Sequence, residues 1–116
     1  MTIDRRSIGD VTILAVQGRI TVQDGADVLC DTVQVLAGQG RSKLVLDFHN
    51  VPYIDSTAIG EIIHAYTTVT RNGGSLKLLH VGGRVHDLLA LTKLLSVFEH
   101  FDAEADAVAS FGIGSV

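Results

Sequence analysis

Leu44-Val-Leu-Asp-Phe48 and, a few residues later, Asp55-Ser-Thr57 decide the fold of this chain. The first segment has apolar residues at odd and even positions alike, which is typical of an inner strand covered on both faces of a sheet. Pro52 prevents a helix in the connection that follows. The three short polar residues are of the kind that caps a helix, and an apolar stripe begins at Ala58. The stretch therefore predicts a buried strand, a turn and a helix.

Two strands and a helix are predicted before this stretch. Val11 to Gln17 places side chains alternately on two faces, and Ile3 to Ile8 can pair with it through a turn at Gly9-Asp10. Apolar residues then recur at intervals of three and four from Ala26 to Ala37. This spacing predicts a helix that ends at the glycines that follow, with Asp24 as its N-cap.

The rest of the chain continues the alternation of helices and strands. The helix that follows Asp55 ends at the Arg71-Asn-Gly-Gly74 turn, and its predicted inward stripe is Ala58, Ile59, Ile62, Ile63, Tyr66, Val69 and Thr70. We expect a strand over 75–81, a helix over 83–92, a short edge strand over 96–101 and an amphipathic helix over 102–111. The prediction is a single α/β domain, residues 1–116, with a mixed β-sheet and the order β-β-α-β-α-β-α-β-α.

Composition excludes several classes of protein. The hydrophobic content of 47% is too high for a disordered chain, yet no apolar run is long enough to span a membrane. A net charge of −4 and a basic cluster of only Arg5-Arg6 argue against direct nucleic-acid binding. No signal-like segment follows the N-terminus, so we expect a cytoplasmic protein without membrane insertion. Cys30, the only cysteine, excludes an internal disulfide, gives no metal-ligand pair by spacing, and is predicted to be a small core residue.

The turn at Asp55 is the candidate functional site. The first backbone N–H groups of a helix lack partners within the helix, and together with the helix dipole they favour a negative group such as a phosphate. Ser56 is therefore a candidate for phosphorylation, with Thr57 as the second candidate. The same residues are also ordinary caps, and spacing alone favours that simpler interpretation.

Several segments together resemble one known family. The chain resembles a STAS domain of the anti-sigma factor antagonist type, and the resemblance covers nearly its whole length. The residues that carry it are Gly18-Arg-Ile20, Leu44 to Phe48 ahead of Ile54-Asp-Ser-Thr57, the Gly73-Gly74 turn, Leu89 to Leu95 ahead of Val97-Phe98, and the final Ala105 to Ala109 helix.

The resemblance implies a regulatory switch protein and not an enzyme. In such antagonists the serine after the aspartate, here Ser56, is phosphorylated by an anti-sigma factor that is also a serine kinase, and a phosphatase reverses the modification. The unmodified form binds the anti-sigma factor and so releases the sigma factor; the phosphorylated form lets go. The residues expected to contact the partner are Thr21, Tyr53, Asp55, Ser56, Thr57 and Ala58.

The chain departs from the family pattern at three positions. Ala58 stands where these antagonists usually have glycine, and alanine favours a tighter helix start, which bears on how a kinase reaches Ser56. Thr21 stands where aspartate is common, and Lys93 replaces a glycine. Both positions bear on the identity of the partner.

Two alternatives remain open at the level of sequence. A non-switched STAS scaffold, or an accessory subunit of a stress-signalling assembly or a transporter, would use the same surface constitutively.

An enzyme is disfavoured, because a nucleophile elbow needs glycines that Asp55 to Ala58 lack, and His64 lies too far along the helix to act as the base for Ser56. His80, His86 and Asp87 have no metal-binding spacing, and Gly82-Gly83 forms no nucleotide fingerprint. We therefore expect no cofactor and no metal.

Overall fold

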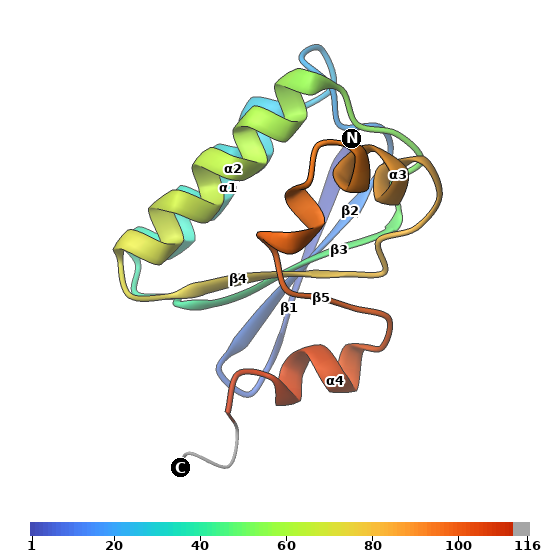
Figure 1. The fold of residues 1–116 in the computed structure, drawn as a ribbon. Helices are drawn as coiled ribbons and strands as arrows, with labels where there is room; N and C mark the ends of the chain where they lie inside the picture. The colour runs from blue at the N-terminus through green and yellow to red at the C-terminus, as the bar shows by residue number, and fades with distance from the viewer. Residues whose placement is uncertain (113–116) are drawn as a thin grey trace.

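The strand with two apolar faces lies at the centre of a five-stranded sheet, as its sequence predicts. In the computed structural model, which describes residues 1–112, the strands lie in the order β1-β2-β3-β4-β5 (Figure 1). β1 is antiparallel to β2, and the remaining pairs are parallel. The elements are β1 Thr2–Ile8, β2 Val11–Gln17, α1 Ala26–Gly38, β3 Lys43–Asn50, α2 Ser56–Arg71, β4 Ser75–Leu79, α3 Gly83–Leu91, the 3-10 helix η1 Leu94–Ser96, β5 His100–Phe101 and α4 Glu104–Ala109. The mixed sheet and the predicted order of helices and strands are confirmed; residues 113–116 of the predicted domain lie outside the described part.

Helices cover the two faces of the sheet unequally. Right-handed crossovers that advance across the sheet in one direction place their helices on one face, which α1, α2 and α3 occupy (Figure 1). Their core includes Leu14, Leu44, Leu46, Phe48 and Leu78 from the strands. The opposite face is covered by α4, whose Ala107 and Val108 pack with Val11, Ile13, Val45 and Leu79. This division explains why β3 is apolar on both sides.

The C-terminal third differs most from the sequence prediction. The expected edge strand over 96–101 is only His100–Phe101, because the chain first makes a 3-10 turn over Leu94–Ser96. The final helix is Glu104–Ala109 and not 102–111. Because both predicted segments are short, a few residues of irregular backbone are enough to replace much of the predicted strand and helix.

Two details of the first two helices also differ from prediction. Gly25, in the left-handed conformation, is the N-cap of α1, and Asp24 makes no cap hydrogen bond to that helix. On α2, Ile63 is 38% exposed and Thr70 is exposed, whereas Ile62 and Val69 are buried. The inward stripe of α2 is therefore narrower than its apolar residues suggest.

The connections that follow β2 and β3 are joined to each other at one edge of the sheet. Parallel strands end at the same edge, so the loops after them meet there. The backbone N–H of Ile20 donates to the carbonyl of Tyr53, and that of Asp55 donates to the carbonyl of Ile20, at 3.1 and 3.2 Å. Ile20 and Ile54 form a parallel bridge. The start of α2 is therefore held by the loop that precedes α1.

Candidate functional site at the start of α2

The carboxylate of Asp55 joins two segments. Its Oδ1 accepts a hydrogen bond from the backbone N–H of Ala58 at 2.8 Å, which caps α2. Its Oδ2 accepts from the backbone N–H of Val22 at 2.9 Å, which belongs to the loop after β2. The cap predicted for the Asp55-Ser-Thr57 segment is thus confirmed, with Asp55 as the N-cap, and the same side chain also fixes the neighbouring loop.

These hydrogen bonds set the ionisation of Asp55. The N–H of Val22, followed by that of Ala58, lowers the pKa of this carboxyl below its ordinary value, because both bonds favour the charged form. Asp55 is therefore a carboxylate at neutral pH. A fixed negative charge lies directly beside Ser56.

Ser56 and Thr57 are both exposed, as a modification site requires. Ser56 is the first residue of α2, and within the described residues neither hydroxyl has a hydrogen-bond partner among side chains or backbone. The Ser56 hydroxyl is therefore accessible from solvent at a helix N-terminus. Thr57 lies on the same first turn.

Ala58 is fully buried, with 0% of its surface exposed. It lies within the first turn of α2, and positive φ among the described non-glycine residues occurs only at His80 and Lys93. Alanine in place of glycine is therefore compatible with this backbone. Its methyl group packs into the core under the turn.

Thr21 lies beneath the surface and organises the loop before α1. Only 9% of it is exposed, and its hydroxyl donates to the Asp24 carboxylate at 3.1 Å. Its carbonyl accepts from the N–H groups of Asp24 and Ala26. Arg19 reaches the same Asp24 carboxylate at 3.3 Å. Asp24, predicted as a helix cap, is instead part of this loop network.

Tyr53 is 39% exposed and contributes to a shallow hollow with Arg19, Pro52 and Arg84. Its residues come from the three connections that follow β2, β3 and β4. Arg19 follows β2, Pro52 and Tyr53 follow β3, and Arg84 lies on the first turn of α3, after β4. Two guanidinium groups and one aromatic ring give it a basic, partly apolar character.

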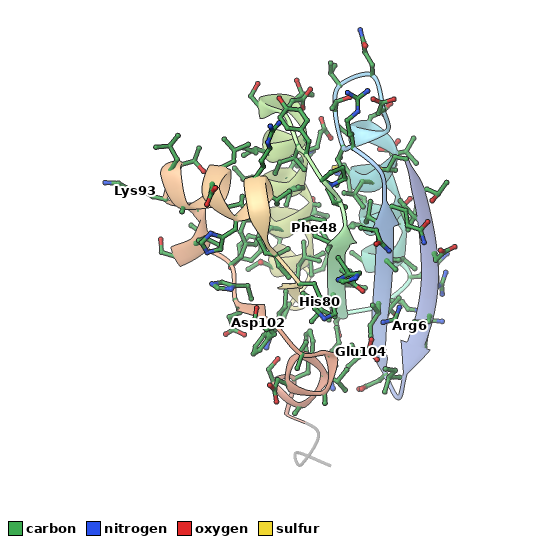
Figure 2. All side chains as sticks on the ribbon, turned by 90° about the vertical axis from the view of Figure 1, so that its right-hand side faces the viewer. Arg6, Phe48, His80, Lys93, Asp102 and Glu104 are labelled. Atoms are coloured by element: carbon green, nitrogen blue, oxygen red, sulfur yellow. The ribbon has the colours of Figure 1, made fainter. Side chains whose placement is uncertain are left out.

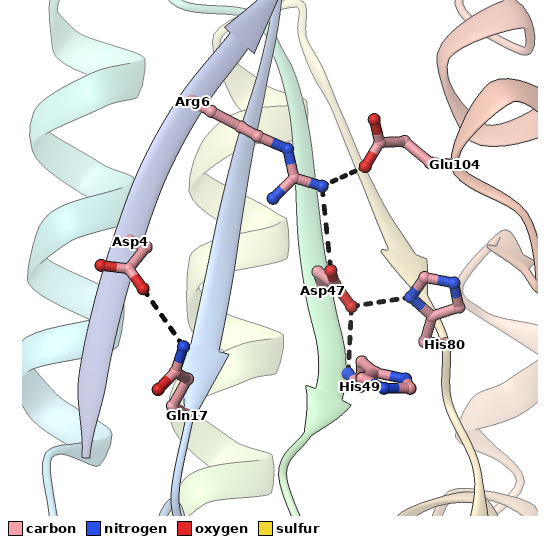
Figure 3. Close-up of polar contacts among 7 residues, drawn as sticks. All are labelled: Asp4, Arg6, Gln17, Asp47, His49, His80 and Glu104. Carbon is pink, nitrogen blue, oxygen red and sulfur yellow. Dashed lines mark hydrogen bonds and ion pairs between the residues drawn. The ribbon is translucent and has the colours of Figure 1, made fainter.

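His80 and His86, for which the sequence predicts no catalytic or metal-binding role, have different partners in the structure. His86 lies 3.6 Å from the carboxylate of its exposed neighbour Asp87. The Nδ1 atom of His80 instead lies 3.0 Å from the Asp47 carboxylate on β3, and the backbone N–H of His49 donates to the same oxygen (Figure 3).

This polar cluster, which sequence reasoning missed, lies on the α4 face of the sheet. Asp47 is only 9% exposed, and Arg6 of β1 lies 4.0 Å from it while pairing with Glu104 of α4 (Figure 3). A carboxylate buried to this degree needs such partners. The cluster draws its residues from β1, β3, the end of β4 and α4, so no local sequence pattern identifies it. The one sequence signal is an aspartate, Asp47, within an otherwise apolar strand.

Lys93 occupies the glycine position of the family pattern in a strained conformation. Its φ is 63°, in the left-handed region, where the chain turns from α3 into η1. The side chain points away from the body of the protein (Figure 2). At this position the backbone therefore has a conformation that glycine adopts at a lower cost in free energy than lysine does.

Comparison with known proteins places this geometry in a family. The chain matches the family model described as "STAS domain" over residues 2–107. It is similar to the anti-sigma-B factor antagonist of Bacillus subtilis (strain 168), with 33% identity over 84 residues, which cover 72% of this chain and 75% of that protein. It is also similar to the anti-sigma F factor antagonist of Paenibacillus polymyxa, with 28% identity over 72 residues. That alignment spans 62% of each chain, less than two thirds of the relative's length.

Solved structures share the fold. A putative anti-sigma factor antagonist from Thermotoga maritima has a TM-score of 0.87 at 23% identity, covering 93% of this chain and 92% of that one. The Bacillus cell fate determinant SpoIIAA in its phosphorylated form has a TM-score of 0.73 at 12% identity, covering 95% and 99%. Since the family model spans nearly all of the described residues and agrees with the observed sheet and helices, the chain belongs to the STAS domain family, whose members include anti-sigma factor antagonists.

Proposed function

We propose that this protein is an anti-sigma factor antagonist whose binding to an anti-sigma factor is switched off by phosphorylation of Ser56. The observation that carries the proposal is the exposed Ser56 hydroxyl on the first residue of α2, beside the ionised Asp55. Relatives with sequence similarity bear the name of anti-sigma factor antagonists, which supports the class of partner.

The chemistry of the switch follows from its position. A serine kinase would transfer the γ-phosphoryl group of ATP to the Ser56 oxygen, with loss of the hydroxyl proton and departure of ADP. The phosphate adds about −1.5 to −2 charges at neutral pH. Placed beside the Asp55 carboxylate, it makes the surface strongly negative, while the N–H groups of the first helical turn limit the cost to the fold.

The partner surface in this proposal has exposed and supporting parts. Tyr53, Ser56 and Thr57 are exposed and would contact the anti-sigma factor directly, next to the carboxylate of Asp55. Thr21 and Ala58 are buried and therefore act from beneath, by holding the loop before α1 and the first turn of α2. This assignment changes the sequence expectation that all six residues touch the partner.

The protein itself is non-catalytic in this proposal and acts in the cytoplasm, where its partners are an anti-sigma factor with serine kinase activity and a phosphatase. Among residues 1–112, no helix combines the length and apolar character that crossing a bilayer requires.

Phosphosite mapping tests the proposal. The chain would be purified from cells of its source, digested, and its phosphopeptides sequenced by mass spectrometry. We expect phosphate on Ser56, retained in a Thr57→Ala variant and absent from a Ser56→Ala variant. A protein that carries no phosphate at Ser56 in either growing or stressed cells would act as a constitutive STAS scaffold or accessory subunit, and the switch proposal would be wrong.

A further inference from the structure

A second group of chemistry-bearing side chains lies between α1 and α2. Cys30 lies on α1, while Glu61 and His64 lie three residues apart on α2 and so share a helix face. One ligand atom from each, the thiol sulfur, a carboxylate oxygen and an imidazole nitrogen, all lie within 4.8 Å of one another. Cys30 is buried, Glu61 is half-buried and His64 is exposed, so the group opens to solvent on one side.

The three ligand types and the sulfur-to-nitrogen spacing fit Zn²⁺. Thiolate, imidazole and carboxylate are the side chains that bind Zn²⁺, usually in tetrahedral geometry. A tetrahedral Zn²⁺ with ordinary Zn–S and Zn–N bonds separates those two ligand atoms by about 3.6 Å. The Cys30 sulfur lies 3.8 Å from Nδ1 of His64. The two helices therefore already hold these atoms near the separation that zinc requires.

The charge around the thiol favours a cation. Two acidic side chains lie near it, Glu61 on α2 and Asp31 on α1. The amide Nε2 of Gln34, one turn along α1, lies 3.4 Å from the sulfur and orients it.

We propose that Cys30, Glu61 and His64 form a zinc site that links α1 to α2, with water as the fourth ligand. On binding, the Cys30 sulfur bonds to Zn²⁺ and its proton leaves to solvent; His64 binds as the neutral ring through Nδ1, and Glu61 as the carboxylate. The site is independent of Ser56 phosphorylation. It explains why the only cysteine lies against an acidic residue and a histidine of another helix.

Cobalt substitution tests the site on the full chain. The protein would be stripped of metal with a chelator and titrated with Co²⁺, which reports thiolate ligation through a sulfur-to-cobalt charge-transfer band in the near ultraviolet. We expect that band to appear at a single Co²⁺ per chain and to disappear when Zn²⁺ displaces the cobalt. Zn²⁺ should also raise the melting temperature of the wild type, because it binds the folded state.

Variants of two proposed ligands distinguish this site from non-specific metal binding. His64→Gln leaves the core untouched and should weaken Co²⁺ binding at least about tenfold and abolish the zinc-dependent rise in melting temperature. Glu61→Gln should act in the same direction, and His86→Gln, which alters a histidine outside the group, should bind like the wild type. Absence of the charge-transfer band, or equal binding by wild type and His64→Gln, would overturn the proposal and leave a Cys30–His64 hydrogen bond only.

Discussion

Asp55 holds the backbone N–H of Val22 at 2.9 Å, and through it the loop after β2 is fastened to the start of α2. A single carboxylate thereby fixes the spacing between two of the segments that form the proposed partner surface. The contact spans 33 residues of sequence. Its loss would disturb both the helix cap and the loop that carries Thr21.

Replacing Asp55 by asparagine should lower stability at neutral pH and much less in acid. Asparagine can still accept from Ala58, but its amide group cannot accept from Val22. Since the pKa of Asp55 is lower in the folded state, its stabilisation is present above the unfolded pKa of about 3.9 and is lost as the pH falls through the folded pKa.

Urea midpoints of wild type and Asp55→Asn at pH 7 and in strong acid provide the measurement. The gap between the two proteins should close on acidification. Asp10, whose pKa Lys43 lowers, is present in both and cancels from the difference. A gap that is the same at both pH values would show that the charge of Asp55 is not what stabilises the turn.

Adjacent isoleucines of α2 should differ sharply in tolerance to charge. Ile62 is 3% exposed and Ile63 is 38% exposed. Ile62→Asp buries an unpaired charge and should cost about 4 kcal/mol or more, enough to unfold most of the protein. Ile63→Asp should remain folded by circular dichroism. Similar unfolding of both variants would mean that the inner face of α2 is assigned wrongly.

Lys93→Gly should stabilise the protein. A non-glycine residue in the left-handed region costs about 1–2 kcal/mol, and glycine regains part of it, so we expect a gain of about 1 kcal/mol. Lys93→Ala keeps the strain and serves as the matched control, with stability near that of the wild type. If urea unfolding showed the same increase in stability for Lys93→Gly and Lys93→Ala, the increase would come from removal of the lysine charge and not from relief of backbone strain.

Thr12→Val should also stabilise the fold. Thr12 is fully buried in β2, and its hydroxyl has no hydrogen-bond partner among residues 1–112. Replacing it by a methyl group removes that desolvation cost and should add about 1 kcal/mol. Thr12→Ser keeps the hydroxyl and removes the methyl group, so it should be less stable than the wild type. The prediction would be wrong if valine lowered the urea midpoint.

The sequence predicts correctly those features that a local pattern of side chains determines. Leu44 to Phe48 predicts an inner strand because both faces of β3 are in fact covered, and Asp55 predicts a cap because capping is a contact over three residues. The same holds for Ser56, which the helix start leaves exposed. These features follow from local geometry.

The remainder depends on distant segments meeting. Val22 reaches Asp55, and Cys30 reaches His64, only after the parallel strands have brought their loops and helices together. Ile63 fits the helical period of α2 but lies beyond the width of the surface that the sheet covers. Asp24 is a good cap residue, yet Thr21 holds it in the loop. No local pattern carries that information.

Capture of partners by four baits tests the switch most directly. Wild type, Ser56→Ala, Ser56→Asp and Ser7→Asp would be immobilised in parallel in lysate of the source cells, and bound proteins identified by mass spectrometry. Ser7 is exposed on β1, at the far end of β2 from the Ser56 turn, so Ser7→Asp controls for added charge alone. Ser56→Asp should fold because aspartate is favourable at a helix N-terminus, and Ser7→Asp should fold because its side chain is exposed to solvent.

We expect a kinase-like anti-sigma factor to be retained by wild type, Ser56→Ala and Ser7→Asp and to be lost with Ser56→Asp. Retention of that protein by Ser56→Asp as strongly as by wild type would contradict phosphorylation of Ser56 as the switch.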